Sequence, residues 1–438
     1  MQIVLLSGGS GKRLWPLSND VRSKQFIKIF PKDDGEYESM VQRVYRQIVA
    51  ADKDAEVTIA TSLSQVSSIR NHLGDQVNIC VEPCRRDTFP AIALAATYLK
   101  DVKGVKDDEA IVICPVDPYV EKDYFEAVSE LSKLASEGTA NMVLMGIEPT
   151  YPSEKYGYVI PESKDEVSKV RTFKEKPDME TAKAYIGEGA LWNGGVFAMK
   201  LGYILKKAHE NIDFTDYKDL YGKYENLTKI SFDYAVVEKE EDISVMRFRG
   251  KWKDLGTWNT LTEAMEEPTI GNVILDDHCS NLHVLNELDV PILCMGLHDI
   301  VVSASPDGIL VSDKEESKYI KSYVDQLGQQ IMFAEKSWGN YRVLDAEEES
   351  VTIKVTLHKG HEMNYHAHEH RDEVWTVISG TGYAYIDDKK RQVYPGDILT
   401  MKAGCKHMLH ADTELIVMEV QMGKDISVKD KQKYKRPE

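Results

Sequence analysis

The sequence has few of the features that mark secreted or membrane-spanning proteins. Its six cysteines are scattered at positions 80, 84, 114, 279, 294 and 405 without CxxC spacing, which argues against a disulfide framework. No apolar run approaches the ~18–20 residues of a membrane-spanning helix. The first residues, MQIVLLSGG, lack the basic region and cleavage site of a signal peptide. We therefore expect a cytoplasmic protein.

Positive charge is also scarce. Lysine and arginine number 54 against 72 aspartates and glutamates, so the net charge is −18. Binding to nucleic acid or to a membrane surface needs a basic field, and we expect neither partner. Anionic substrates would have to be captured by local clusters of cationic side chains.

Length and pattern predict several domains in the 438 residues. Residues 1–266 alternate short β-rich runs with helical stretches, which is typical of an α/β domain with a mostly parallel sheet. Residues 267–330 form a β-rich, β-helix-like linker segment that ends in a helical stretch. Residues 331–425 are predicted to be all-β, and the charged residues 426–438 a flexible tail.

The segment 4–26, VLLSGGSGKRLWPLSNDVRSKQF, carries the strongest signal. An apolar strand runs into Gly8, Gly9 and Gly11, whose backbone N–H groups can close on phosphate oxygens. Arg13 and Lys24 add cationic donors. A glycine turn after a strand fits a plain structural turn equally well, so the flanking residues must decide.

These flanking residues resemble the sugar nucleotidyltransferases, and within them the mannose-1-phosphate guanylyltransferases, whose signature reads GGxGxRLWPLSxxxxPKQF. The chain departs from it at Lys12 and Ser23. Further matches follow in order along the chain: EPCRRDTFPAI (82–92), PVDPYV (115–120), GIEPTYPSEKYGYVI (146–160), FKEKPD (173–178), WNGGVF (192–197), FDYAVVEK (232–239) and WKDLGTW (252–258).

The resemblance implies a Rossmann-like domain in which a sugar-1-phosphate oxygen attacks the α-phosphorus of a nucleoside triphosphate and releases pyrophosphate. Negative charge grows at that phosphorus, so fixed cations and a divalent metal are needed. Arg13 and Lys24 suit the first role, and Asp117 and Asp254 are expected to hold Mg²⁺. Taken alone, Asp117 would fit a helix cap or a turn as well.

The nucleotide-binding segment is the least typical part. Glu82 and Asp87 are expected to bind the nucleotide, together with the glycine loop. Relatives of this type usually carry RNTAPAI, whereas this chain has RDTFPAI. Asp87 could still accept hydrogen bonds from guanine N–H groups, so GTP is the expected nucleotide, with another nucleotide as the alternative.

The middle motifs are expected to bind the sugar phosphate. Glu175 can accept hydrogen bonds from sugar hydroxyls, Lys176 can pair with the phosphate, and Asn193 offers a donor and an acceptor. Gly157 would let the backbone approach the ligand, although it could equally be a turn glycine. Mannose 1-phosphate is the expected sugar substrate, with another sugar-1-phosphate as the alternative.

Most of the twelve histidines lie between 358 and 410. His366, His368 and Glu373 fit the first cupin motif, G(x)5HxH(x)4E(x)6G, and His407 fits the second. On a strand, HxH places both imidazoles on one face, and side chains from neighbouring strands can complete a divalent site inside a jelly roll. The sequence predicts a transition metal there, zinc or similar.

This region also resembles the type II phosphomannose isomerase domain that follows the guanylyltransferase in bifunctional enzymes. That domain reads QxHxHRxEHW, whereas this chain has HAHEHRDEVW, with His366 for the glutamine and Val374 for the last histidine. Arg371 is retained as a candidate for the substrate phosphate. Proton transfer between C1 and C2 needs a base, so three roles stay open: active isomerase, metal-loaded domain of another role, or structural cupin.

The leading hypothesis is a guanylyltransferase for GDP-mannose synthesis, which serves polysaccharide biosynthesis, with a cupin that isomerises a hexose 6-phosphate. A transferase of other substrate specificity and a non-catalytic sugar-nucleotide sensor are the alternatives. The β-rich regions offer edges for self-association, and a homo-oligomer, a dimer, is expected.

Overall fold

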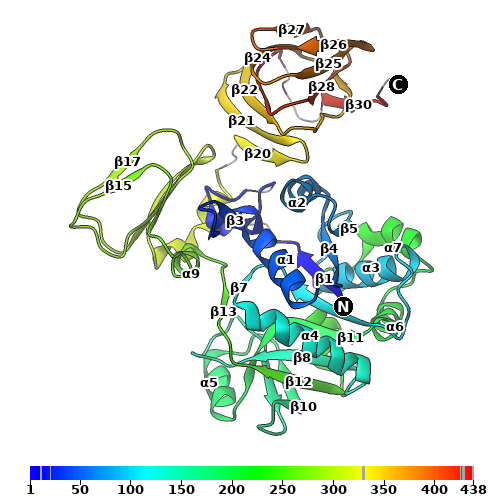
Figure 1. Cartoon of the computed structure of the whole chain (residues 1–438). Helices are drawn as coiled ribbons and strands as arrows, with labels where there is room; N and C mark the ends of the chain where they lie inside the picture. The colour runs from blue at the N-terminus through cyan, green and yellow to red at the C-terminus, as the bar shows by residue number, and fades with distance from the viewer. Residues whose placement is uncertain (10–11, 20, 328–330, 425, 427–429, 437–438) are drawn as a thin grey trace. The chain divides into compact units, whose positions relative to one another are not determined.

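A computed structural model describes residues 1–9, 12–19, 21–327, 331–424, 426 and 430–436 (Figure 1). The chain divides into two compact units. The first comprises residues 1–10, 23–66 and 73–266, and the second comprises residues 11–22, 67–72 and 267–438. Two short stretches of the N-terminal sequence therefore belong to the second unit. Within the described ranges, no helix is long and apolar enough to cross a membrane.

The first unit is built on a nine-stranded sheet. In spatial order its strands are β5 (Asn78–Glu82), β4 (Glu56–Ser62), β1 (Gln2–Ser7), β6 (Ala110–Pro115), β11 (Leu191–Lys200), β8 (Met142–Ile147), β12 (Ile243–Phe248), β10 (Val167–Lys174) and β9 (Tyr158–Pro161). Two short ladders stand beside it, β2 (Lys28–Pro31) with β3 (Tyr37–Ser39), and β7 (Pro118–Val120) with β13 (Trp252–Asp254).

Helices cover the sheet because its strands are apolar on both faces. Val4 belongs to the large core cluster, while its neighbours Ile3 and Leu5 are equally buried on the other face. The α-helices among the described residues are α1 (Met40–Ala51), α2 (Val66–Leu73), α3 (Thr88–Asp101), α4 (Lys122–Glu137), α5 (Met179–Gly187), α6 (Leu201–Asn211), α7 (Tyr217–Lys223), α8 (Phe232–Ala235), α9 (Trp258–Thr262) and α10 (Lys321–Val324).

Two helix groups pack on this sheet. Helix α3 contacts β1, β4 and β5 together with α6, α7 and α8, and its apolar residues fill the core cluster. Helix α4 contacts β6, β8 and β11, with α1 beside it (Figure 1). The carboxyl ends of β1 and β6 are thereby left for the loops that carry the signature motifs.

The sheet differs from the mostly parallel one predicted from the sequence. β5, β4, β1 and β6 are parallel to one another, as are β8 and β12. β11 runs antiparallel to both β6 and β8, and β10 runs antiparallel to β9 and β12. Strands alternate with helices in the parallel part of the sheet, β5, β4, β1 and β6. The pattern does not extend to β9 and β10, which follow each other without an intervening helix.

The β-rich segment of the second unit stacks short parallel strands. β14 (Thr269–Ile270), β16 (His283–Asn286) and β18 (Ile300–Ser305) pair in parallel, and β19 (Gly308–Asp313) closes the sheet antiparallel. β15 (Val273–Leu275) and β17 (Ile292–Cys294) form a second parallel pair. A small core that includes Leu282, Val284 and Val302 lies between these strands.

The C-terminal part is a jelly roll of two sheets. One sheet runs β20 (Phe333–Lys336), β21 (Gly339–Ala346), β22 (Ser350–Leu357), β29 (Leu415–Met422), β24 (Asp372–Ser379) and β27 (Ile398–Met401). The other runs β26 (Lys389–Val393), β25 (Gly382–Ile386), β28 (His407–Ala411), β23 (His366–His368) and β30 (Lys431–Lys433). Apolar side chains of both sheets, Trp375 and Leu409 among them, form one core.

The prediction of a flexible tail at 426–438 was wrong. Within its described residues, β30 pairs antiparallel with β23, and the Asp430 carboxylate accepts hydrogen bonds from the backbone N–H groups of Glu369 and His370. An unpaired strand edge can bind a segment that has no apolar pattern of its own. The helical stretch predicted after residue 313 is confirmed: it consists of a 3-10 helix, Glu316–Tyr319, followed by the four-residue α10.

Candidate functional site

Lys24 and two aspartates meet at one point of the first unit. The Lys24 Nζ lies 2.7 Å from Asp117 Oδ2 and 3.4 Å from Asp254 Oδ1. Asp117 follows β6, and Asp254 ends β13, whose pairing with β7 sets Asp254 opposite Pro118. The short ladder therefore brings two motifs together that are far apart in sequence.

The electrostatics of this group favour a bound divalent cation, because two carboxylates face a single ammonium. Burial lowers the pKa of Lys24, but the two carboxylates more than offset this and raise it, so the ammonium stays charged. The carboxylates remain open, with 36% and 44% of the Asp117 and Asp254 side chains exposed. Two open carboxylates facing one cationic point form a donor set that suits Mg²⁺, which prefers a few carboxylates together with phosphate oxygens.

The glycine loop rests on a buried polar network. The Ser23 hydroxyl donates to the Gly9 carbonyl at 3.0 Å and accepts from Gln65 Nε2 at 2.6 Å. Gln25 Nε2 donates to the Ser7 hydroxyl at 2.9 Å. Ser23, which replaces the proline of the signature, thus has a contact that proline lacks.

The loop itself is open. A Cβ placed on Gly8 or Gly9 would meet nothing within 4 Å, so neither glycine is needed for packing there. Gly11 lies outside the described residues. Arg13 is exposed and belongs to the second unit. Arg85, which the motif comparison did not single out, places Nη2 3.5 Å from the Gly9 carbonyl and adds a cation beside the loop.

The two residues expected to bind the nucleotide base have structural partners. Glu82 is buried, and its carboxylate accepts a hydrogen bond from the Tyr224 hydroxyl at 2.7 Å. Burial raises the pKa of Glu82. Asp87 is exposed at the start of α3, where Oδ1 accepts from the Thr88 N–H, and its φ of 71° is left-handed. Such a backbone is costly for a non-glycine residue and often marks a functional position.

The four residues expected to bind the sugar phosphate lie together. A Cβ on Gly157 would lie 2.5 Å from Glu175 Oε2 and 3.3 Å from the Asn193 Cβ. The Asn193 N–H donates to the Gly157 carbonyl at 2.8 Å, and the Lys176 ammonium pairs with the Glu175 carboxylate. The close approach explains why this position is a glycine.

Asp233 completes this cluster and was missed as a site residue. Its Oδ1 accepts a hydrogen bond from Asn193 Nδ2 at 2.8 Å. Burial and the neighbouring Glu175 raise the pKa of Asp233 to about 6. It belongs to the motif FDYAVVEK, but a single carboxylate within a motif does not reveal its partner.

Aromatic rings connect the aspartate pair with the sugar cluster. Trp252, two residues before Asp254, lies with its ring centroid 5.5 Å from Tyr156 and 6.3 Å from Trp192, the neighbour of Asn193. Such rings give a ligand site rigid apolar walls.

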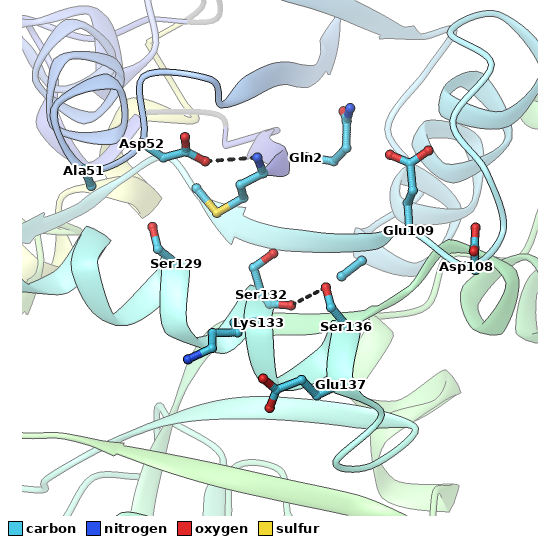
Figure 2. Close-up of a pocket in the computed structure, with 12 residues that line it drawn as sticks. Gln2, Ala51, Asp52, Asp108, Glu109, Ser129, Ser132, Lys133, Ser136 and Glu137 are labelled. Atoms are coloured by element: carbon cyan, nitrogen blue, oxygen red, sulfur yellow. Dashed lines mark hydrogen bonds and ion pairs between the residues drawn. The ribbon is translucent and has the colours of Figure 1, made fainter.

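A pocket of about 690 Å³ opens at the other ends of the strands (Figure 2). Gln2 and Ala110, the first residues of β1 and β6, line it, and the Met1 ammonium pairs with Asp52 at 2.9 Å. None of the predicted site residues lines this pocket. Open α/β sheets bind their ligands beyond the carboxyl ends of the strands, and Asp117 follows the carboxyl end of β6.

In the cupin, His366, His368 and His407 form a buried cluster whose ligand atoms lie within 4.8 Å of one another. His366 pairs with His407 across β23 and β28. Glu373 reaches the cluster from β24 in the other sheet, with Oε1 3.3 Å from His368 Nε2 and Oε2 3.2 Å from His407 Nε2. All four predicted ligands are therefore brought together.

The donor set fits a transition-metal ion. Burial, with the charge of Lys431, lowers the pKa of His366 to about 2, and burial lowers that of His368 to about 4. Both imidazoles are therefore neutral, the form that binds metal. Glu373 Oε2 and His407 Nε2 are buried without a hydrogen-bond partner among the described residues, and such atoms are costly unless a cation lies between them.

Two charged residues adjoin the histidine cluster. Arg371 is buried, and its Nε lies 2.9 Å from Glu373 Oε1, so the proposed phosphate ligand contacts a proposed metal ligand. Glu419 on β29 is buried opposite Trp375 of β24. It was not among the candidate site residues identified from the sequence. Burial and Glu373 raise its pKa. The strand register places Glu373 and Glu419 on one face, a relation that single-strand patterns do not reveal.

Comparisons with known proteins agree with this geometry. The nucleotidyl transferase family model matches residues 2–269, and the model described as mannose-6-phosphate isomerase C-terminal matches residues 325–435. The mannose-1-phosphate guanylyltransferase of Klebsiella pneumoniae is 27% identical over 99% of each chain. The xanthan biosynthesis protein XanB of Xanthomonas campestris is 28% identical over 96% of this chain and 95% of its own.

A solved structure is also similar. The protein from Thermus thermophilus described as a mannose-1-phosphate geranyltransferase is 27% identical, with a TM-score of 0.62 over 74% of this chain and 98% of its own. This similarity extends over about three quarters of the chain, and both the sequence and the fold support it.

Proposed function

Because the chain belongs to the nucleotidyl transferase family, we propose that it transfers GMP from GTP to mannose 1-phosphate, forming GDP-mannose and pyrophosphate. The meeting of Lys24, Asp117 and Asp254 carries this proposal. Full-length relatives named as mannose-1-phosphate guanylyltransferases support the choice of substrates.

The described residues suit an in-line displacement at the α-phosphorus. Asp117 and Asp254 would hold Mg²⁺, which when bound neutralises charge on the phosphates and the transferred group. Lys24 holds a fixed positive charge at the same point, and Arg13 is proposed to contact the phosphates as a second fixed cation. Gly8, Gly9 and Gly11 are proposed to supply backbone donors, and Glu82 and Asp87 to face the nucleotide.

The sugar phosphate is proposed to bind at Gly157, Glu175, Lys176 and Asn193. Lys176 would exchange its Glu175 partner for the phosphate, which frees the Glu175 carboxylate for sugar hydroxyls. Asp233 would hold the Asn193 amide in one orientation. The aromatic rings of Trp192 and Trp252, whose centroids lie 6.3 Å apart, would form an apolar wall beside the bound sugar.

A substrate panel tests this proposal. The full chain is incubated with each nucleoside triphosphate and several sugar-1-phosphates in Mg²⁺, and pyrophosphate release is measured. We expect turnover with GTP and mannose 1-phosphate, and none after Mg²⁺ is removed by a chelator. Turnover with another pair alone would favour a transferase of different specificity, and no turnover with any pair would contradict the proposal.

For the cupin we propose a metal-dependent isomerisation of fructose 6-phosphate to mannose 6-phosphate. The buried donor set of three histidines and Glu373 carries this second function. The metal, zinc or a similar ion, would polarise the substrate oxygens. Arg371 is proposed to contact the phosphate, and Val374 leaves the proton transfer to another group.

Metal content and a coupled isomerase assay test the cupin. We expect about one transition-metal ion per chain, lost in His407→Ala and retained in His361→Ala, whose side chain is exposed outside the cluster. Metal loss should also lower the thermal unfolding temperature. If metal is bound but no isomerase turnover is seen, even after the protein is reloaded with metal, the isomerase proposal is contradicted and the domain binds metal for another role. If no metal is bound, the cupin is structural.

A further inference from the structure

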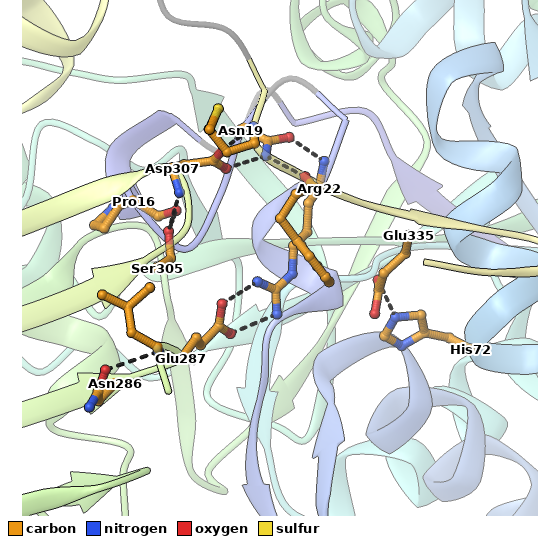
Figure 3. A network of polar contacts seen from close by, with 12 residues as sticks. Pro16, Asn19, Arg22, His72, Asn286, Glu287, Ser305, Asp307 and Glu335 are labelled. Atoms are coloured by element: carbon orange, nitrogen blue, oxygen red, sulfur yellow. Dashed lines mark hydrogen bonds and ion pairs between the residues drawn. The ribbon is translucent and has the colours of Figure 1, made fainter. Parts of the chain in front are cut away.

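Within the second unit, the β-rich segment binds the part of the signature from Lys12 to Arg22, which carries Arg13. We call this part the signature segment. The Arg22 guanidinium makes two hydrogen bonds to Glu287, Nη1 to Oε2 at 2.8 Å and Nη2 to Oε1 at 2.9 Å (Figure 3). Arg22 is 6% exposed. A bidentate pair of this kind fixes direction as well as distance.

A second contact involves Asn19 and Asp307. Asn19 Nδ2 donates to Asp307 Oδ2 at 2.7 Å, while Asn19 Oδ1 accepts from the N–H groups of Val21 and Arg22 at 2.8 and 2.7 Å. Asp307 Oδ1 accepts from the Met332 N–H at 2.7 Å. The Asn19 side chain therefore organises the turn, and Asp307 holds that side chain (Figure 3).

A third contact binds the beginning of the segment. The Ser305 hydroxyl donates to the Pro16 carbonyl at 2.7 Å and accepts from the Asp307 N–H at 3.1 Å. A Cβ on Gly308 would lie 2.4 Å from the Trp15 ring, so the indole lies directly on the backbone of β19. We call Glu287, Ser305 and Asp307 the loop clamp.

The physical cost of these contacts argues that position matters here. Burial lowers the pKa of Arg22, but the charge and hydrogen bonds of Glu287 outweigh it and raise the pKa, so the guanidinium is charged in a nearly closed environment. Buried charges are expensive and break even only with good geometry. Apolar side chains would bind the segment as firmly, but without fixing its register.

We propose that the loop clamp positions the signature segment, and with it Arg13, for the nucleotide phosphates. Glu287 and Asp307 are then positioning residues for nucleotidyl transfer, although neither needs to touch the substrate. This inference rests on the proposed transferase function. A phosphate site gains from donors held in place before the ligand arrives.

Kinetics of the full chain test the proposal. In Glu287→Ala and Asp307→Asn we expect kcat for transfer from GTP to fall about tenfold, because Arg13 is no longer fixed where charge grows at the phosphorus, while the KM for mannose 1-phosphate stays within about threefold of wild type. Glu287→Gln keeps one acceptor and nearly the same shape, so it should give a smaller fall in kcat, and it replaces Glu287→Ala in the test if that variant does not fold. Asp289→Asn is the matched control, because it breaks a neighbouring ion pair, Asp289 with Arg342 at 2.8 Å, that does not touch the segment.

Hydrogen exchange supplies a readout that does not depend on turnover. The Val21 and Arg22 amides should exchange about tenfold faster in the clamp variants than in wild type or Asp289→Asn. Unchanged exchange would overturn the clamp, and faster exchange with an unchanged kcat would overturn its positioning role. If the wild-type protein shows no turnover, the proposed transferase function is contradicted. The hydrogen-exchange rates of Val21 and Arg22 would still show whether the clamp holds the segment.

Discussion

In the first unit the Lys24 ammonium contacts two aspartates whose side chains are 36% and 44% exposed, whereas His368, Glu373 and His407 in the cupin are each 2% exposed. The first site consists of one ammonium and two carboxylates that can exchange partners with solvent. The cupin site consists of imidazoles around a carboxylate, buried between the strands of two sheets.

This difference suits two ways of using a metal. An open carboxylate pair can receive a hard cation that arrives with the phosphates of a substrate. A closed histidine cluster, in which two buried atoms lack a hydrogen-bond partner within the described part of the chain, suits a cation that stays. We therefore expect the two sites to respond independently to mutation, and oppositely to acid.

The largest effect is expected at the open site. Asp117→Asn removes one carboxylate of the pair and should lower kcat for nucleotidyl transfer by about 10³-fold, because charge at the phosphorus is no longer stabilised. The metal content of the cupin should not change. Asp108→Asn, exposed at the opposite strand ends, is the charge-matched control. Loss of the cupin metal in Asp117→Asn would contradict the independence of the two sites.

Acidification should destabilise the metal-free cupin. Because the folded-state pKa values of His366 and His368 are lowered, unfolded chains bind more protons below pH 6.5, and the free energy of unfolding falls as the pH drops. At pH 5 each histidine should contribute a loss of about 2 kcal/mol relative to pH 7. Thermal unfolding of chelator-treated protein at the two pH values measures it.

Asp233 should respond with the opposite sign in the same experiment. Its raised pKa, about 6 against an ordinary 3.8, means that the folded state holds a proton that the unfolded chain releases. Its cost to stability is therefore largest above pH 6 and decreases as the pH falls toward 3.8. Asp233→Asn should remove this contribution. Equal shifts of both units on acidification, independent of Asp233, would contradict the assignment.

The smallest effect is expected at the proposed sugar site. In Gly157→Ala the new methyl group would meet Glu175 Oε2 at 2.5 Å, so the carboxylate must move. We expect the KM for mannose 1-phosphate to rise about tenfold with little change in the KM for GTP. Gly187→Ala, where a Cβ meets nothing within 4 Å, should match wild type. A normal KM in Gly157→Ala would place the sugar elsewhere.

Much of the architecture was predictable because local pattern and motif order carry it. The α/β domain, the following β-rich segment and the cupin are confirmed, as is the family inferred from the collinear motifs. The antiparallel strand β11 and the paired strand β30 were not predicted. Strand direction and edge pairing depend on long-range hydrogen bonds that leave little trace in composition.

Residue types and spacing by themselves determined which chemistry this chain can carry: a phosphate loop, two aspartates, an HxH motif and a distant histidine. Only the tertiary structure decided the partners. It places Lys24 between Asp117 and Asp254, adds Asp233 and Glu419, and ties Arg22 to Glu287. The physical reason is that a side chain's charge is written in the sequence, whereas its neighbours depend on register and packing between distant segments.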